Sequence, residues 1–209
     1  MKKLFISVLA LLVLIIASGA NAKSIRIGTE GAYPPWNNLN AAGELEGAEI
    51  DFGNEACKRM SVDCEWVIQD WDGILPALLN GKYDIIIAGM SITDERKKKV
   101  NFTDGYMTDG IRFAALKNSG LGNLGTNWSG SQTKKVDLSN PSGKDLAAVG
   151  QLNAALKGKI VGAQGATTHQ NYVQKYMQGV VELRLYQTMD DLHLDLAAGR
   201  IDAAIGDVG

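Results

Sequence analysis

The segment 88–96 (AGMSITDER) combines the residue types best suited to holding a small anion. It follows an apolar run at 83–87 that predicts a buried strand. Ala88 and Gly89 would let a ligand approach the backbone closely, and Ser91 adds a hydroxyl. Arg96 offers a rigid fork of donors that fits a carboxylate with two parallel hydrogen bonds. We therefore expect this segment to bind an anionic group of a small molecule.

Other polar and aromatic residues follow other expected strands, where ligands of open α/β sheets bind. These residues are Glu30, Tyr33, Trp36, Trp71, Gln164, Thr167 and Asp207. With Arg96, the set holds one cation, two anions, aromatic faces and several hydrogen-bond donors. A zwitterion needs a cation for its carboxylate and an anion for its ammonium. The second anion suits a further positive group, which aromatic faces would favour by about 0.5–2 kcal/mol.

Plainer roles stay open for these residues. The aromatic side chains could belong to the core, and the two acids could cap helices or lie on the surface. Arg96 could pair with Asp94 or Glu95 on its own helix, a contact worth only about 0.3–0.5 kcal/mol when exposed. His169 and His193 have no acid or nucleophile at a recognisable spacing, so we expect both on helix surfaces and predict no catalytic residue.

Strand and helix patterns alternate along the chain. Strands are expected at 24–28, 64–68, 83–88, 111–116, 159–163, 181–186 and 201–205. Helices are expected at 49–60, 72–79 and 189–198, and after N-caps at Thr93 and at Thr167 or Thr168. This order predicts an α/β fold with mostly parallel sheets covered by helices.

Two further patterns bear on domain organisation. Residues 117–150 are rich in Gly, Ser and Asn without a clear period, which predicts a linker or flexible surface insertion. Residues 79–87 (LNGKYDIII) resemble 197–205 (AAGRIDAAI), because in both a glycine, a base and an aspartate precede an apolar run. The repeat favours two lobes, although a pattern common to α/β proteins in general explains it equally well.

The N-terminus predicts export. Lys2 and Lys3 precede an apolar run at 4–17, and Ala20-Asn21-Ala22 follows as a small-x-small cleavage signal. We expect residues 1–22 to be a signal peptide cleaved after Ala22, with an uncleaved anchor as the alternative. Without the two lysines, 19 of the 21 basic residues remain against 23 acidic ones. The absence of a basic patch excludes nucleic acid as an expected partner.

The two cysteines, Cys57 and Cys64, are expected to pair in an exported chain. A loop this short stabilises a fold by roughly 2.5 kcal/mol in the chain-entropy model. Two cysteines without a nearby histidine make a poor zinc site, so we predict no metal and no cofactor.

Five segments together carry a family resemblance: IGTEGAYPPWN at 27–37, CKRM through Cys64 at 57–64, WDGILPAL at 71–78, MSIT through Arg96 at 90–96, and LAAGRIDAA at 196–204. The chain resembles periplasmic solute-binding proteins of the polar amino-acid ABC transport family (family 3). The branch it resembles binds lysine/arginine/ornithine, histidine or octopine/nopaline. The resemblance covers nearly all of 23–209 outside the 117–150 insertion.

The resemblance implies a two-lobed (type II) periplasmic binding protein, each lobe a mostly parallel sheet flanked by helices. Lobe 1 would span 23–113 and lobe 2 would span 114–209, with a hinge near 111–116. Relatives continue beyond the position of Gly209, so we expect a C-terminal truncation and an incomplete second lobe.

The resemblance also implies roles for the polar residues. Arg96 would clamp the ligand α-carboxylate with help from Ser91 and Thr167, and Asp207 would receive the α-ammonium. Tyr33 and Trp71 would sandwich the ligand side chain.

Two features bear on the ligand. Glu30 would meet a distal cation of arginine, lysine, ornithine or an opine. Relatives that bind lysine or arginine often carry Asp at this position, and the opine binders carry Glu. Ala88 and Gly89 stand where relatives carry serine, which enlarges the pocket and keeps opines in consideration.

The implied function is capture of a cationic amino acid or an opine by hinge closure, without catalysis. A monomeric periplasmic protein would then deliver the ligand to an ABC permease in the inner membrane. Two alternatives stay open: a ligand-binding module of a membrane sensor, and a cyclohexadienyl-type dehydratase with Glu30 as its acid or base.

Overall fold

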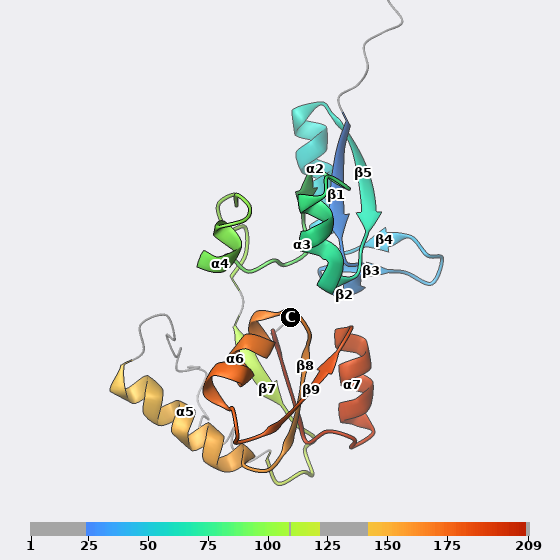
Figure 1. Ribbon diagram of the computed structural model, residues 1–209. Coiled ribbons are helices and arrows are strands. Elements are labelled where there is room, and N and C mark those ends of the chain that lie inside the picture. The colour runs from blue at the N-terminus through green and yellow to red at the C-terminus, as the bar shows by residue number, and fades with distance from the viewer. Residues whose placement is uncertain (1–23, 109, 122–141, 208–209) are drawn as a thin grey trace, which may run out of the picture.

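The computed structural model describes residues 24–108, 110–121 and 142–207, whose elements form two α/β groups. We call the elements from β1 to α4 the first half and those from β7 to β10 the second half. Figure 1 shows the first half above the second, each with its own sheet and helices. The predicted signal peptide lies outside the described residues.

The first half is built on a three-stranded parallel sheet in the order β5-β1-β6. Its elements are β1 (Ser24–Thr29), α2 (Ala48–Met60), β5 (Asp63–Ile68), α3 (Trp71–Leu79), β6 (Ile85–Ile86) and α4 (Asp94–Lys97). A small antiparallel sheet inserts after β1 and comprises β2 (Ala32–Tyr33), β3 (Asn37–Leu39) and β4 (Leu45–Glu46). Thr93 caps α4 as predicted, because its hydroxyl accepts the N–H of Arg96 at 3.2 Å.

The second half has a four-stranded sheet in the order β7-β10-β8-β9. Its elements are β7 (Ile111–Ala114), α5 (Gly143–Leu156), β8 (Ile160–Gln164), α6 (Thr168–Tyr176), β9 (Glu182–Tyr186), α7 (Met189–Ala197) and β10 (Ala203–Asp207). β7 runs antiparallel to β10, and the other pairs are parallel. Figure 1 shows α5 and α6 on one side of this sheet and α7 on the other. The predicted α/β class with mostly parallel sheets is confirmed.

The predicted insertion at 117–150 is wrong over its last eight residues, because α5 begins at Gly143. Ser142 and Asp145 form a reciprocal capping box, in which each side chain accepts the other's backbone N–H. The glycines at 143 and 150 favoured a loop, whereas this Ser-x-x-Asp spacing indicates the start of a helix. Residues 122–141 of the insertion lie outside the described ranges.

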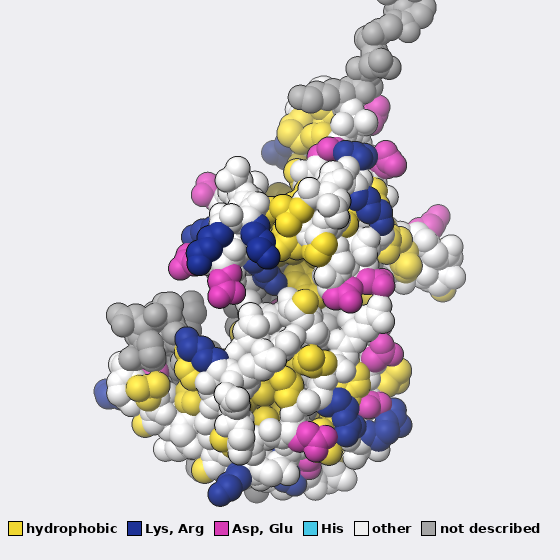
Figure 2. Space-filling model, viewed as in Figure 1, with side chains coloured by type: hydrophobic (Ala, Val, Ile, Leu, Met, Phe, Trp, Pro, Cys, Tyr) yellow, Lys and Arg dark blue, Asp and Glu magenta, His cyan; other side chains and the backbone are white. Residues whose placement is uncertain are grey.

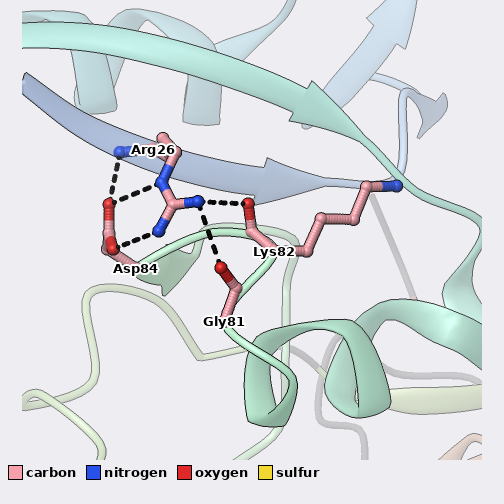
Figure 3. A network of polar contacts seen from close by, with 4 residues as sticks. All are labelled: Arg26, Gly81, Lys82 and Asp84. Carbon is pink, nitrogen blue, oxygen red and sulfur yellow. Dashed lines mark hydrogen bonds and ion pairs between the residues drawn. The ribbon is translucent and has the colours of Figure 1, made fainter.

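The sequence repeat corresponds to a repeated structure. Figure 3 shows Asp84 accepting the backbone N–H of Arg26 at 2.9 Å and pairing with its guanidinium at 2.8 Å. In the second half, Asp202 accepts the backbone N–H of Ile160 at 2.8 Å and the ammonium of Lys159 at 3.0 Å. Each aspartate thus fixes the start of one strand, β6 or β10, to the neighbouring parallel strand, β1 or β8. The Arg26 hydrogen bond holds the pKa of Asp84 below its usual value.

The predicted Cys57–Cys64 disulfide is present and joins the end of α2 to β5, with Cα atoms 6.1 Å apart. Cys57 is also packed in a buried cluster with Ile27 and Ile87. Across the described ranges, no helix combines the length and apolar character needed to cross a bilayer.

Gly28 in β1 is a position where the packing leaves no room for a side chain. A Cβ there would lie 2.5 Å from the ring of Tyr83, which is 1 % exposed and fixed by a hydrogen bond to the carbonyl of Ile74. We expect Gly28→Ala to lower the free energy of unfolding by about 1–3 kcal/mol through overpacking. Gly150→Ala is the control, since its Cβ meets open space within α5 and should stabilise by about 0.5–1 kcal/mol. Urea denaturation of both variants measures the difference, and equal stability of the two would contradict this packing.

Candidate functional site

One pocket lies where the two halves meet, and the nine residues for which the resemblance implied a ligand contact all line it. Its lining comprises Glu30, Tyr33, Trp71, Ala88, Gly89, Ser91, Arg96, Gln164, Thr167, Thr168, His169 and Asp207. Gln164 thus lines it too, whereas Trp36, the other strand-end candidate, is half-buried and does not. In Figure 2 the halves meet along a narrow waist, with Lys and Arg side chains gathered over α4 beside it. The carboxyl ends of β1, β8 and β10 bring residues from separate parts of the chain to this place.

Arg96 supplies the cation from the first half. Its guanidinium donates to the carbonyl of Ser91 at 2.9 Å and, across the waist, to the carbonyl of Ala166 at 3.4 Å. It also lies over the ring of Trp71, with Cζ 5.5 Å from the ring centroid. Burial lowers the pKa of Arg96 from its usual value. Within the described ranges, both of these acceptors are neutral carbonyl oxygens. A bound anion would therefore compensate the positive charge of Arg96.

The first turn of α6 faces the same pocket from the second half. Thr167 caps this helix by accepting the N–H of Gln170 at 3.2 Å, and its hydroxyl donates to the carbonyl of Gln164 at 2.7 Å. Thr168 and His169 follow in the first turn. A helix N-terminus favours negative charge, so Arg96 and α6 together suit a carboxylate.

Asp207 supplies an anion at the end of β10. Its carboxylate accepts the hydroxyl of Tyr33 at 2.8 Å, and the Nε2 atom of His169 lies 2.9 Å from its second oxygen. Burial alone would raise the pKa of Asp207, but the hydrogen bonds from His169 and Tyr33 outweigh it and leave the pKa lowered. Asp207 therefore stays ionised at neutral pH and can receive a cation.

The prediction that His169 lies on a helix surface is wrong. The residue is 4 % exposed, lines the pocket and contacts Asp207. Its position two residues after the N-cap of α6, at the carboxyl end of β8, was the available sequence signal. His193 is exposed on α7, as expected.

Glu30 is a second acid in the pocket and is 7 % exposed. Its Oε1 atom accepts a hydrogen bond from Nε2 of Gln164 at 2.6 Å. Burial, together with the charges of Asp70 and Asp190, raises the pKa of Glu30 to about 7 despite this bond. Glu30 thus exchanges its proton near neutral pH, unlike Asp207.

A buried glutamate, Glu49, positions the loops that carry these groups, and sequence reasoning did not single it out. Oε1 of Glu49 accepts the N–H of Gly89 at 2.7 Å and the hydroxyl of Tyr106. Oε2 accepts a hydrogen bond from Nδ2 of Asn37 at 2.7 Å. Oδ1 of Asn37 in turn accepts the backbone N–H of Gly31 at 2.7 Å. The chain around Glu30 and the loop at Gly89 are therefore joined through one side chain.

Direct contacts hold the two halves together around the pocket. Besides Tyr33–Asp207 and Glu30–Gln164, the indole N–H of Trp71 donates to the carbonyl of Ala166 at 3.2 Å. The cavity among these residues is about 20 Å³, which is room for roughly one water molecule, and a second cavity of about 140 Å³ adjoins it at Tyr33, Gly89, Ser91 and Asp207. An amino acid can therefore bridge Arg96 and Asp207 only if the halves separate or their side chains turn away.

The described residues include no group of three or more His, Cys, Asp or Glu side chains placed to hold a metal ion. The chemistry that this pocket offers is charge pairing and hydrogen bonding to a small dipolar molecule.

Comparison with known proteins identifies the family. The model of the bacterial extracellular solute-binding proteins, family 3, matches residues 25–193. The chain belongs to this family, as its sequence motifs predicted.

Curated relatives include the octopine-binding periplasmic protein of Rhizobium meliloti, 37 % identical over 194 residues. That alignment covers 93 % of this chain and 64 % of the relative, so the chain spans less than two thirds of its length. The L-arginine-binding protein of Pseudomonas aeruginosa is 35 % identical, with 99 % of this chain and 70 % of the relative covered.

Solved structures support the two-lobed fold. An ancestral arginine-binding protein bound to arginine has a TM-score of 0.69 at 32 % identity, covering 88 % of this chain and 70 % of that one. An ancestral arginine-binding protein bound to glutamine has a TM-score of 0.67 at 33 % identity, covering 88 % of this chain and 69 % of that one. The predicted fold class is confirmed.

Glu30 should leave a signature in the pH dependence of stability without ligand. Its pKa is higher in the folded chain than the ordinary value of 4.5, so the unfolded chain binds fewer protons between these values. The contribution of Glu30 to stability is therefore full below about pH 4.5 and is lost as pH rises to about 7. We expect the unfolding free energy of the parent, relative to Glu30→Gln, to fall by up to roughly 3 kcal/mol over this range. A constant difference in urea titrations from pH 4.5 to 7.5 would contradict it.

Proposed function

We propose that this chain is the periplasmic substrate-binding component of an ABC importer and captures a cationic amino acid or an opine. Arginine, lysine and ornithine are the candidate amino acids. The observation that carries the proposal is that Arg96 from the first half and Asp207 from the second line one pocket, together with Glu30. One cation and two anions complement a ligand with one carboxylate and two positive groups.

Each pole of such a ligand has a matching group. Arg96 and the first turn of α6 receive the α-carboxylate, with Ser91 and Thr167 beside them. Asp207 receives the α-ammonium, and Glu30 receives the distal cation.

Aromatic and small residues shape the rest of the pocket. Tyr33 and Trp71 flank the ligand side chain, and the small side chains at Ala88 and Gly89 leave room for a larger opine once the halves open. The relatives whose names describe octopine and arginine binding support this choice of ligands.

Closure follows from the location of these groups on both halves. The cavity between Arg96 and Asp207 is smaller than an amino acid, so a ligand that bridges these two residues requires opening around the connection to β7. A ligand that binds both halves stabilises the closed form in proportion to its preference for that form. The closed protein, as a monomer, would then dock an inner-membrane ABC permease. Relatives named as binding proteins favour this function over the sensor and dehydratase alternatives.

Removing the guanidinium tests the proposal. We expect Arg96→Ala to weaken binding of arginine or octopine by at least about 2 kcal/mol, roughly 30-fold, because a buried ligand carboxylate loses its partner. Lys97→Ala is the matched control, since Lys97 is exposed on α4 and pairs only weakly with Asp94 at 3.8 Å. Isothermal titration calorimetry compares both variants with the parent. Equal affinity for Arg96→Ala and the parent would rule out the role of Arg96.

A further inference from the structure

We propose that Glu30 lets this pocket exchange one class of ligand for another according to pH. When Glu30 is ionised, the pocket takes side chains with a cationic end. When Glu30 is protonated, the pocket takes side chains of similar length with an uncharged carbamoyl end, an amide or a urea. The inference rests on the proposed function, because it assumes that the ligand side chain points at Glu30.

The first argument is the neutral environment of Glu30. The partner of its carboxyl is the side-chain amide of Gln164, whose Nε2 also donates to the carbonyl of Gln187 at 2.9 Å. Among the residues that the structure describes, no Lys, Arg or His forms an ion pair with Glu30. A buried carboxylate without a cation is costly, and either a proton or a ligand cation removes that cost.

The second argument is the charge on the elements that surround Glu30. Asp70, which precedes α3, and Asp190 in α7 are both acidic and disfavour a further negative charge. The other charged or ionisable side chains of the pocket are engaged elsewhere: Arg96 with two carbonyls, and His169 with Asp207. The elevated pKa of Glu30 agrees with this arrangement. The cation that stabilises the ionised form must therefore come from the ligand.

The side-chain amide of Gln164 suits both forms of the Glu30 carboxyl. An ionised Glu30 accepts its N–H through a carboxylate oxygen, and a protonated Glu30 accepts the same N–H through its carbonyl oxygen, which leaves the O–H free for the ligand. Toward the ligand, a carboxylate only accepts and so matches a guanidinium or ammonium. A carboxylic acid both donates and accepts, as a carbamoyl group does.

Linkage gives the sign of each pH dependence. A cationic ligand favours the ionised form, so its affinity should fall about tenfold for each pH unit below about 7 and its binding should release protons. An uncharged ligand favours the protonated form, so its affinity should fall about tenfold for each unit above 7 and its binding should take up protons.

Arginine and citrulline are the matched probes, because citrulline carries a urea in place of the guanidinium and is otherwise the same. Their α-groups meet the same Arg96, Asp207 and His169, so titration of those residues cancels in the ratio of the two affinities. Calorimetry of the 209-residue chain at pH 5.5, 6.5, 7.5 and 8.5, in buffers of different ionisation enthalpy, measures the affinities and the proton exchange.

We expect the arginine-to-citrulline affinity ratio to fall at least tenfold from pH 7.5 to 5.5, with proton release on arginine binding at pH 6.5. Glu30→Gln should make the ratio independent of pH and favour citrulline throughout. Glu95→Gln is the control for loss of an exposed acid near the pocket and should behave as the parent.

The outcomes separate the two proposals. Arginine binding with a constant ratio and no proton exchange would overturn the role of Glu30 but leave the proposed function standing. Failure of citrulline to bind at pH 5.5 would do the same. Failure of arginine and octopine to bind the parent at pH 8.5 would overturn the proposed function, and this inference with it. If Glu30→Gln does not fold, proton release by the parent still decides the question.

Discussion

The pocket depends on charges that are withdrawn from water without an internal partner of opposite sign for each. The guanidinium of Arg96 contacts carbonyls, and the carboxyl of Glu30 contacts an amide. Asp207 is better compensated, because it contacts both His169 and Tyr33, and these hydrogen bonds keep its carboxyl ionised. A dipolar ligand would supply the missing countercharges. The cost of buried charge then becomes a source of affinity, and the closed arrangement gains stability when the ligand is present.

A small number of local interactions position these charged side chains. Parallel strands end at the waist in both halves, and α6 points its N-terminus there. Asp84 and Asp202 join neighbouring strands near their starts, at the ends of the two sheets that lie away from the waist. Glu49 joins the loop at Gly89 to the chain around Glu30. Rigid halves with a polar interface between them suit a hinge motion in which the pocket is assembled only on closure.

Much of this arrangement was accessible from sequence, and the gaps have physical causes. The strand-end rule brought together Arg96, Asp207 and Glu30, which are distant in sequence, because parallel topology fixes where strand ends meet. His169 was missed because its partner Asp207 lies 38 residues away, so their contact depends on how the fold brings α6 to the end of β10. Glu49 was missed because its role comes from three hydrogen bonds to residues distant in sequence, Asn37, Gly89 and Tyr106. The start of α5 was missed because glycine composition outweighed a capping box in the interpretation.

The central claim is that one ligand bridges the halves between Arg96 and Asp207. A crystal structure of the chain grown with arginine tests this most directly. The account predicts ligand carboxylate oxygens about 3 Å from the guanidinium of Arg96 and the α-nitrogen about 3 Å from the carboxylate of Asp207. Arginine bound to one half alone, or in a different cavity with Arg96 and Asp207 facing away from it, would contradict the account.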